Sequence, residues 1–317
     1  QQIKKKNWAD NYLSRFIEKI KFLLKSNSIN QAQKNIHFHY DLGNKFYSLW
    51  LDSTMTYSSG IFLKETDNLS TSQNNKYDNI IQNLDIQSSD TVLEVGSGWG
   101  GFIKRNFEKT KSQIEGLTIS EQQFSYVQEL IKKNNLNNNS KIIFKDYRKL
   151  NSINFYDKIV SIEMFEAVGE KHWPEYFQSI AKCLKPGGKA CIQTIVIAED
   201  LFERYRHSTD FIQQYVFPGG MLPSRASFKA AATKAGLRIE NEFAFGMDYA
   251  KTLCIWRDNF NQKLQEIRDL GFDEAFIRLW NFYLMYCAAG FAERSIDVVQ
   301  FTLSHSSSKA SSYALTI

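Results

Sequence analysis

An apolar segment that ends in a cluster of glycines constrains this chain more than any other feature. Residues 91–101 read Thr-Val-Leu-Glu-Val-Gly-Ser-Gly-Trp-Gly-Gly, and a helical pattern follows. β-Branched residues favour a strand, and glycine permits both the positive φ of a tight turn and a close approach of the backbone to a ligand. The segment therefore predicts a strand and a turn beneath a nucleotide-like cofactor. The turn residues that we expect to contact it are Gly96, Ser97, Gly98, Trp99, Gly100 and Gly101.

The glycine spacing alone leaves two types of cofactor open. Gly96, Gly98 and Gly101 fit the dinucleotide pattern, which requires an acid about 20 residues further on, and Glu115 lies near that distance. However, Glu115 is followed by Gly-Leu-Thr-Ile-Ser rather than by the end of a strand. Another acid, Glu94, precedes the first glycine, where a carboxylate suits an amine or a sulfonium better than a pyrophosphate. These features favour S-adenosylmethionine.

The pattern around and after this turn predicts an α/β fold. Strand patterns at 91–95, 112–117, 141–145, 157–162 and 189–196 alternate with helical patterns at 99–109, 120–134 and 173–183. Such alternation is typical of a doubly wound, mostly parallel sheet that binds its ligand at the carboxyl ends of the strands. A further helix is expected just before Asp85, and a turn at 185–188. The segments 67–76 and 134–140, which are rich in Asn and Ser, are predicted to be surface loops.

Three parts of the chain are predicted. Residues 1–35 form an amphipathic helix and a linker, residues 36–305 one large domain, and residues 306–317 a polar tail. An aromatic, helical segment at about 197–225 interrupts the α/β order, and we expect it to form a lid or one wall of an apolar pocket.

The amino-terminal segment combines positive charge with an apolar stripe. Lys4, Lys5 and Lys6 precede apolar residues that recur at helical spacing from Trp8 to Leu24. Basic amphipathic helices bind anionic membrane surfaces, whereas the alternative is a helix that packs on its own domain. Aromatic and basic residues do not gather into a nucleic-acid-binding module, so no nucleic acid partner is predicted. A homodimer is compatible with the sequence.

The cysteine pattern and the hydropathy of the chain indicate the cellular compartment in which we expect it. Cys183, Cys191, Cys254 and Cys287 have no CxxC or Cys/His spacing, so neither a disulfide framework nor a metal site is predicted. No run of eighteen apolar residues and no signal peptide is visible. We therefore expect a cytoplasmic protein.

Ordered motifs give the chain a resemblance to a known family. They include His39-Tyr40-Asp41-Leu42-Gly43-Asn44, Met55-Thr56-Tyr57-Ser58, Val92 to Gly101, Gly116 to Ser120 with Gln123, Asp146-Tyr147-Arg148, Phe165-Glu166-x-Val168-Gly169, Phe217-Pro218-Gly219-Gly220, Tyr249-x-x-Thr252-Leu253 and Tyr283-Leu284-x-x-Cys287. From about residue 36 to 305 the chain resembles the cyclopropane-fatty-acyl-phospholipid synthases, which include the mycolic acid cyclopropane synthases. The resemblance implies a seven-stranded, Rossmann-like class I methyltransferase fold.

The resemblance also implies a reaction and a set of site residues. The reaction is methyl transfer from S-adenosylmethionine to a cis double bond of a phospholipid acyl chain at the membrane surface, followed by proton loss to a bound bicarbonate and ring closure. The residues matched to the bicarbonate site are Glu166, Tyr249 and Cys287. Three positions depart from the commoner pattern: Ser59 where many members have cysteine, Gln193 where some have histidine, and Ala167 where histidine usually follows the glutamate. Those matched to the methyl donor, besides Glu94 and the turn, are Tyr57, Ser58, Thr118, Ile119, Ser120, Gln123, Asp146, Tyr147 and Arg148.

Three other functions are alternatives to cyclopropane formation. One is a lipid C-methyltransferase that gives methyl- or methylene-branched chains. Another is an amine N-methyltransferase on the same scaffold. The third, a lipid-binding module without catalysis, is disfavoured because the glycine turn and Glu166 are both intact.

Overall fold

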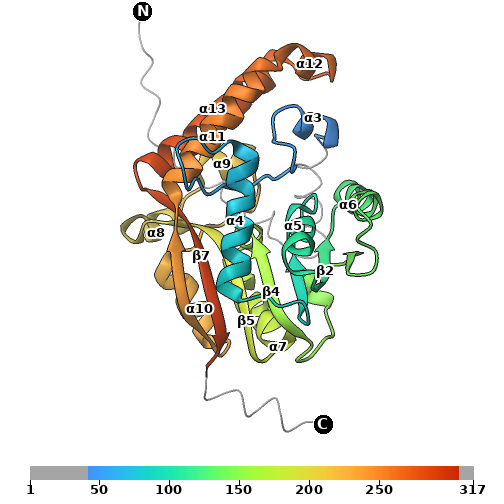
Figure 1. Cartoon of the computed structure of the whole chain (residues 1–317). Helices are drawn as coiled ribbons and strands as arrows, with labels where there is room; N and C mark the ends of the chain where they lie inside the picture. The colour runs from blue at the N-terminus through green and yellow to red at the C-terminus, as the bar shows by residue number, and fades with distance from the viewer. Residues whose placement is uncertain (1–41, 307–317) are drawn as a thin grey trace, which may run out of the picture.

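The computed structural model of the protein describes residues 42–306, and a seven-stranded sheet runs through its centre (Figure 1). The spatial order is β3-β2-β1-β4-β5-β7-β6. Every pairing is parallel except those of β7, which runs antiparallel to both β5 and β6. The bounds of the strands are β1 (Thr91–Val95), β2 (Gln113–Thr118), β3 (Ser140–Phe144), β4 (Tyr156–Ile162), β5 (Leu184–Ile197), β6 (Leu237–Ala244) and β7 (Ile296–His305). The predicted doubly wound, mostly parallel sheet is confirmed. The expected amino-terminal helix and linker and most of the tail lie outside the described residues.

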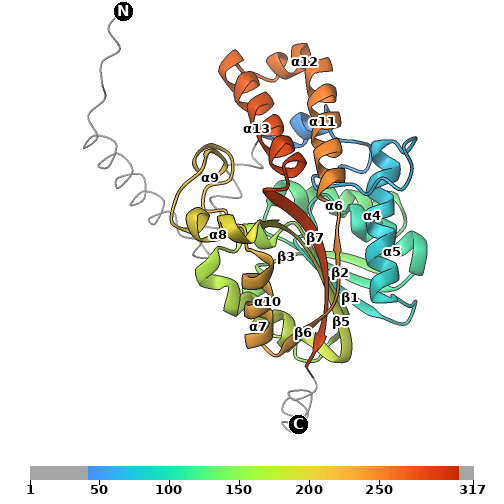
Figure 2. The same cartoon turned by 90° about the vertical axis from the view of Figure 1, so that its left-hand side faces the viewer.

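Helices cover both faces of the sheet (Figure 2). On one face lie α4 (Leu69–Leu84), α5 (Gly101–Thr110) and α6 (Glu121–Lys133), and on the other α7 (Trp173–Cys183) and α10 (Arg225–Lys234). Side chains of β1 alternate between the layers, since Val92 packs among α4, α5 and α6 whereas Leu93 and Val95 pack toward α7. Successive side chains of a strand point to opposite faces, so a strand buried on both sides reads as a continuous apolar run.

The beginning of α4 corrects one prediction. Residues 69–76, expected in a surface loop, form the first two turns of this helix. Asn68 caps it by accepting a hydrogen bond from Thr71 N at 2.9 Å, and Gln73 and Lys76 are fully buried. Asn and Ser favour loops because their side chains compete for backbone hydrogen bonds, but burial of one face against the protein outweighs that weak preference. The turn expected at 185–188 also differs, because these residues lie within the irregular start of β5.

A helical cap lies over the carboxyl edge of the sheet. Figure 1 shows α11 (Gly246–Gln262) and α13 (Glu274–Ala292) side by side above β7, with α12 (Leu264–Asp269) joining them. These helices share an aromatic core with α3 (Asn44–Ser48) and the residues just after it. Phe46 and Trp50 are fully buried in this core. The segment 197–225 contributes α8 (Glu199–Arg206) and α9 (Phe211–Tyr215).

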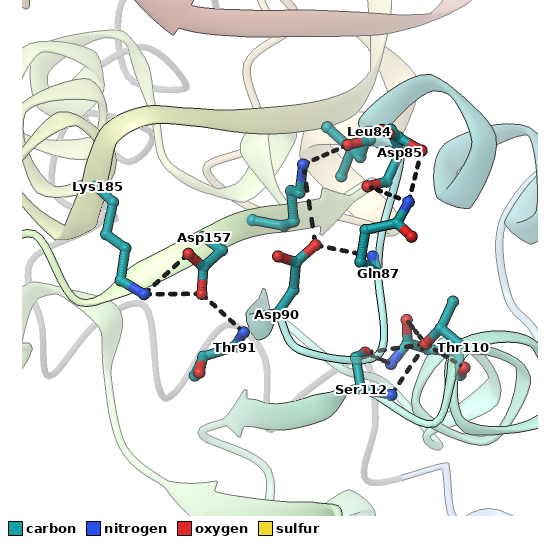
Figure 3. A network of polar contacts seen from close by, with 11 residues as sticks. Leu84, Asp85, Gln87, Asp90, Thr91, Thr110, Ser112, Asp157 and Lys185 are labelled. Carbon is teal, nitrogen blue, oxygen red and sulfur yellow. Dashed lines mark hydrogen bonds and ion pairs between the residues drawn. The ribbon is translucent and has the colours of Figure 1, made fainter.

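The opposite, amino edge of the sheet is closed by polar contacts (Figure 3). Asp157 accepts hydrogen bonds from Thr91 N at 2.9 Å and from Lys185 Nζ at 2.8 Å. Nearby, Lys158 Nζ donates to the carbonyl oxygen of Leu84 at 2.6 Å. These bonds join β1, β4, β5 and the end of α4.

Between residues 42 and 306, no helix combines the length and the apolar character that crossing a membrane requires. The four cysteines are all free thiols.

Candidate active site

A cavity of about 760 Å³ opens above the carboxyl edge of the sheet. This volume lies within the usual range for small-molecule sites. Its walls come from the turns that follow β1, β2, β3 and β4, from the end of β5, and from α8, α9, α11 and α13. The cavity thus lies where a doubly wound sheet binds ligands.

The glycine turn after β1 forms one end of the cavity, and its backbone has the conformation that glycine permits. Gly96 has φ 83° and Gly98 has φ 51°. A Cβ at Gly96 would lie 2.8 Å from Cγ of Met164, whereas a Cβ at Gly98 would meet no atom within 4 Å. Since Gly98 lines the cavity, the space above it is available to a ligand.

Two buried polar atoms at this end make no hydrogen bond of good geometry with the described residues, although the Ser97 hydroxyl lies near enough to Glu94 to oppose the effect of burial on its pKa. The two atoms are Oε2 of Glu94 and Oγ of Ser97. Burial raises the pKa of Glu94 to about 8. Leaving such atoms unpaired costs about 1–3 kcal/mol each, which a bound ligand with donor groups relieves. S-adenosylmethionine carries an amine, hydroxyls and a sulfonium, so the residues present fit this cofactor.

Most residues predicted to contact the cofactor line the same cavity. The hydroxyl groups of Tyr57 and Tyr283 form a hydrogen bond of 2.7 Å, which joins the loop before α4 to α13. The indole Nε1 of Trp99 donates to Oδ1 of Asn44 at 2.8 Å, which joins the glycine turn to α3. The predicted cofactor residues in the lining are Tyr57, Ser58, Glu94, Gly96, Ser97, Gly98, Trp99, Gly101, Thr118, Ile119, Gln123, Asp146, Tyr147 and Arg148.

The other two predicted cofactor residues support the lining from outside it. At Gly100, a Cβ would lie 3.1 Å from Cγ2 of Val127, so this glycine permits α5 to pack on α6. The hydroxyl of Ser120 caps α6 by accepting from Gln123 N at 3.4 Å. Gln123 in turn accepts from the hydroxyl of Thr118 at 2.9 Å, which orients the amide toward β2.

The cavity is also lined by a carboxylate that the motifs did not select. Glu163, the first residue after β4, accepts hydrogen bonds from Ser59 N at 3.0 Å and Gln193 Nε2 at 2.7 Å on Oε1. Its Oε2 accepts from the hydroxyl of Tyr249 at 2.5 Å. We call these four residues the acid cluster. Burial raises the pKa of Glu163, and burial together with the charge of Glu163 raises the pKa of Tyr249.

Glu166 lies one turn further on, in the short helix η2 (Phe165–Ala167), and lines the same cavity. Its Oε1 accepts from Ile195 N at 2.5 Å and from the Thr194 hydroxyl at 3.0 Å, whereas Oε2 is buried without a partner among the described residues. Burial, followed by the negative charge of Glu163, raises the pKa of Glu166 to about 8. Burial thus raises the pKa of both carboxyl groups in this site.

The remaining predicted catalytic residues fall into two groups. Tyr249 and Cys287 line the cavity, and burial raises the pKa of the Cys287 thiol. Ser59 and Gln193 lie behind the wall and reach it through Glu163. The Ser59 hydroxyl donates to the carbonyl oxygen of Gly60 at 3.0 Å, so only the backbone of this residue faces the acid cluster.

A buried lysine supplies positive charge below the acid cluster. Lys76 on α4 is fully buried, and its Nζ donates to Oγ of Ser58 at 2.5 Å and to Oε1 of Gln73 at 2.7 Å. Burial lowers the pKa of Lys76 to about 7, while the negative charge of Glu163 opposes that shift. Sequence reasoning missed both residues. Glu163 stands three positions before Glu166 at the end of a predicted strand, and that spacing was the available signal. Nothing local marks Lys76.

Comparison with known proteins places the chain in a family. A family model described as mycolic acid cyclopropane synthetase matches residues 27–301. Tuberculostearic acid methyltransferase UfaA1 of Mycobacterium tuberculosis is 37% identical over 87% of this chain and 66% of its own length. Cyclopropane-fatty-acyl-phospholipid synthase of Escherichia coli K12 is 35% identical over 84% of this chain and 66% of its own length. The chain thus spans slightly less than two thirds of these two relatives.

A solved structure gives the same result for the fold. The crystal structure of mycolic acid cyclopropane synthase CmaA1 complexed with SAH (S-adenosylhomocysteine) and CTAB is 29% identical, with a TM-score of 0.80. The match covers 86% of this chain and 97% of that one. The glycine turn, the cavity above it and these similarities agree: the chain belongs to the mycolic acid cyclopropane synthetase family of S-adenosylmethionine-dependent methyltransferases.

Proposed function

We propose that this protein transfers a methyl group from S-adenosylmethionine to the cis double bond of an unsaturated phospholipid acyl chain, and that the product is a cyclopropane fatty acid. One observation carries the proposal: a single cavity is lined both by the glycine turn and by apolar side chains of the segment 197–225. Leu201, Tyr205 and Phe217 are among these side chains. An acyl chain is the substrate class that such a wall accommodates.

The acid cluster supports carbon methylation in particular. Methyl transfer to an alkene leaves a carbocation, which requires a dry site and a base for the departing proton. Glu163, and Glu166 beside the cluster, both line the cavity and supply carboxyl groups for that purpose. The sulfonium, when bound, supplies the electrophilic methyl group, and the residues of this chain hold it in line with the double bond and exclude water.

One finding favours a second product. The relative at 37% identity is named a tuberculostearic acid methyltransferase, whereas the relative at 35% is named a cyclopropane synthase. If the proton leaves from a neighbouring chain carbon, the product is a methyl-branched alkene. If a hydride shifts to the cationic carbon first and the transferred methyl group then loses its proton, the product carries a methylene branch. The position of the base relative to the two carbons therefore decides between ring and branch.

Lipid analysis after expression in a host without such lipids tests the reaction. We expect unsaturated acyl chains to gain one CH₂ unit, and NMR to show the high-field ring protons of a cyclopropane. Methyl-branch signals would instead identify the C-methyltransferase, and methylation of an added amine without any lipid product would contradict the proposal. Gly98→Val serves as the inactive control, because it fills the cofactor end of the cavity.

We also propose that the protein works at the cytoplasmic face of a membrane. Tyr215, Phe282 and Tyr286 are 57%, 52% and 43% exposed, and Phe211 packs against Phe282 with ring centroids 4.7 Å apart. Tyr286 also lines the cavity, so this aromatic rim borders the entrance for an acyl chain. The four free cysteines are typical of a reducing compartment.

Vesicle co-sedimentation of the full-length chain tests the association. Anionic vesicles are expected to bind the protein, and added salt to weaken binding, because surface charge is screened within about 10 Å at 0.1 M. Exchange of Lys4, Lys5 and Lys6 for glutamine is expected to reduce the binding. If the native chain and the glutamine variant bind the vesicles equally and salt does not weaken the binding, the basic segment packs on its own domain.

A further inference from the structure

The hydrogen-bond donors expected to hold a bicarbonate ion already hold a side chain of this protein. Ser59 N, Gln193 Nε2 and the Tyr249 hydroxyl converge on the carboxylate of Glu163 from residues that lie far apart in the sequence. We infer that Glu163 replaces the bound bicarbonate as the general base of the reaction. The inference rests on the proposed function and concerns the residue that accepts the proton.

The residues at this place do not fit an additional anion. The hydroxyl of Ser59 is directed to the carbonyl oxygen of Gly60, and the methyl side chain of Ala167 offers no donor. Gln193 gives its amide N–H to Glu163 and accepts at Oε1 from Gln300 Nε2 at 3.0 Å. A bicarbonate would also lie beside a buried carboxylate, and like charges repel strongly where water is excluded.

A chain of amide groups fixes the orientation of Gln193. Asn79 Nδ2 donates to Gln300 Oε1 at 2.7 Å, and Gln300 Nε2 donates to Gln193 Oε1. The NH₂ group of Gln193 must therefore face Glu163, because an amide oxygen in that position would meet the carboxylate. Asn79 and Gln300 act on the base only through Gln193, so they are positioning residues.

The backbone of Glu163 is also held in a costly conformation. Its φ is 49°, in the left-handed region that non-glycine residues rarely adopt. The N–H of Glu163 donates to the carbonyl oxygen of Gln193 at 2.8 Å, which stabilises this geometry from β5. Conformations of this kind persist where the surroundings enforce them, and they concentrate at functional sites.

Lys76 supplies a positive charge near the acid. It is buried below the cavity, and its charge opposes the effect of burial on the pKa of Glu163. Two hydrogen bonds, to Ser58 and Gln73, hold its amine in place. Positive charge and three donors together favour the ionised carboxylate, which is the form that accepts a proton.

The free lone pair of the carboxylate shows which atom accepts the proton. Among the contacts of the described residues, Oε1 accepts two hydrogen bonds and Oε2 only the one from Tyr249. Oε2 therefore keeps one lone pair that no described residue uses, and Glu163 itself lines the cavity.

The step balances with Glu163 as the only base. The π electrons of the alkene form the bond to the incoming methyl carbon, and the electron pair of the broken carbon–sulfur bond stays on sulfur. Oε2 of Glu163 then takes a proton from the new methyl group, and the electrons of that C–H bond close the ring. The protonated acid returns its proton to water when the product leaves.

Two substitutions at Glu163 test the inference. Glu163→Gln keeps the shape but cannot accept the proton, so turnover is expected to fall by about 10² or more. Glu163→Gly suits φ 49° and opens space beside the same three donors. For this variant we expect turnover to recover in part when bicarbonate is added. Glu129→Gln, an exposed acid on α6, is the matched control that removes one carboxylate elsewhere.

A binding measurement gives a second readout that does not require turnover. ¹³C NMR of labelled bicarbonate is expected to show binding to Glu163→Gly and none to the native chain. Calorimetry with S-adenosylhomocysteine is expected to give the same affinity for all of these chains. If the native chain shows no lipid product, the proposed function fails while this measurement still tests the site. The inference is overturned if the native chain binds bicarbonate in the cavity, loses turnover in CO₂-free buffer, or tolerates Glu163→Gln.

Discussion

The two ends of the cavity are built in opposite ways. The glycine turn end comes from one contiguous segment, residues 91–101, and leaves Oε2 of Glu94 and Oγ of Ser97 buried without a hydrogen bond of good geometry to the described residues. The acid cluster draws on four separate segments, and three donors bind the carboxylate of Glu163. The unpaired atoms at the first end indicate a place that a ligand fills, whereas the three donors at the second end hold a carboxylate in position and leave one lone pair of its Oε2 unused. The comparison assigns cofactor binding to the first end and proton transfer to the second.

The largest expected effect comes from filling the cofactor end. In Gly98→Val, the side chain enters space where no atom lies within 4 Å, so the affinity for S-adenosylhomocysteine should fall by at least about a hundredfold, or about 3 kcal/mol. Calorimetric titration measures it. Gly187→Val is the matched control, because Gly187 also has positive φ and an open Cβ position but lies outside the cavity. Similar losses in both variants would mean that backbone strain, not occupied space, is responsible.

The next effect concerns charge at the same end. Glu94→Gln removes the carboxylate that faces the cavity, and a hydrogen bond to a charged group contributes about 2 kcal/mol, so affinity for S-adenosylhomocysteine should fall about thirtyfold. Turnover at saturating cofactor should change much less. Steady-state kinetics separates KM from kcat. A fall in kcat alone would mean that Glu94 acts in proton transfer, which would contradict the assignment of the glycine-turn end to cofactor binding.

Tyr249→Phe tests the other end. The variant loses the hydrogen bond to Oε2 of Glu163, so kcat should fall about tenfold while cofactor affinity stays constant. Losing a donor to the charged form raises the pKa of Glu163 further, and the acidic limb of the pH profile of kcat should move to higher pH. Tyr156→Phe, which loses a tyrosine bond to Glu115 at the opposite edge of the sheet, controls for stability. An unchanged pH profile would argue against Glu163 as the titrating base.

The smallest effect is expected at Lys76. Burial lowers the pKa of Lys76 to about 7, so the amine is charged mainly below that pH. Lys76→Met removes a charge that favours ionised Glu163, and kcat should fall about threefold at pH 6 but little at pH 8.5. The matched control is Lys158→Met, a largely buried lysine at the amino edge. A loss that is equal at both pH values would show that Lys76 acts by packing alone.

The pH dependence of stability gives an independent check on Lys76. Because its pKa is lower in the folded protein than the ordinary value of 10.5, the folded state binds fewer protons between about pH 7 and 10.5. The contribution of Lys76 to the free energy of unfolding therefore rises with pH across that window and falls as the pH decreases toward 7. Thermal unfolding of Lys76→Met should show a gain relative to the native chain at pH 6.5 that shrinks by pH 10.

The sequence by itself determined the sheet, the glycine turn and the cofactor class. These features are local: a β-branched run, four glycines and an acid before them lie within residues 91–101, and their geometry follows from backbone sterics. The resemblance in ordered motifs extended the same information along the chain. Glu166, Tyr249 and Cys287 were placed in one cavity by those motifs, and the structure has all three in its wall.

Only the tertiary structure decided what holds the acid. The family motifs assigned Ser59, Gln193 and Tyr249 to one site, but they did not show that all three donate to Glu163, which no motif selected. The same holds for Lys76, whose segment looks like a loop because Asn and Ser compete with helical hydrogen bonds. Packing against the sheet made that segment a helix and buried its lysine. Local preferences set the elements, and burial of distant segments against one another set the charges of the site.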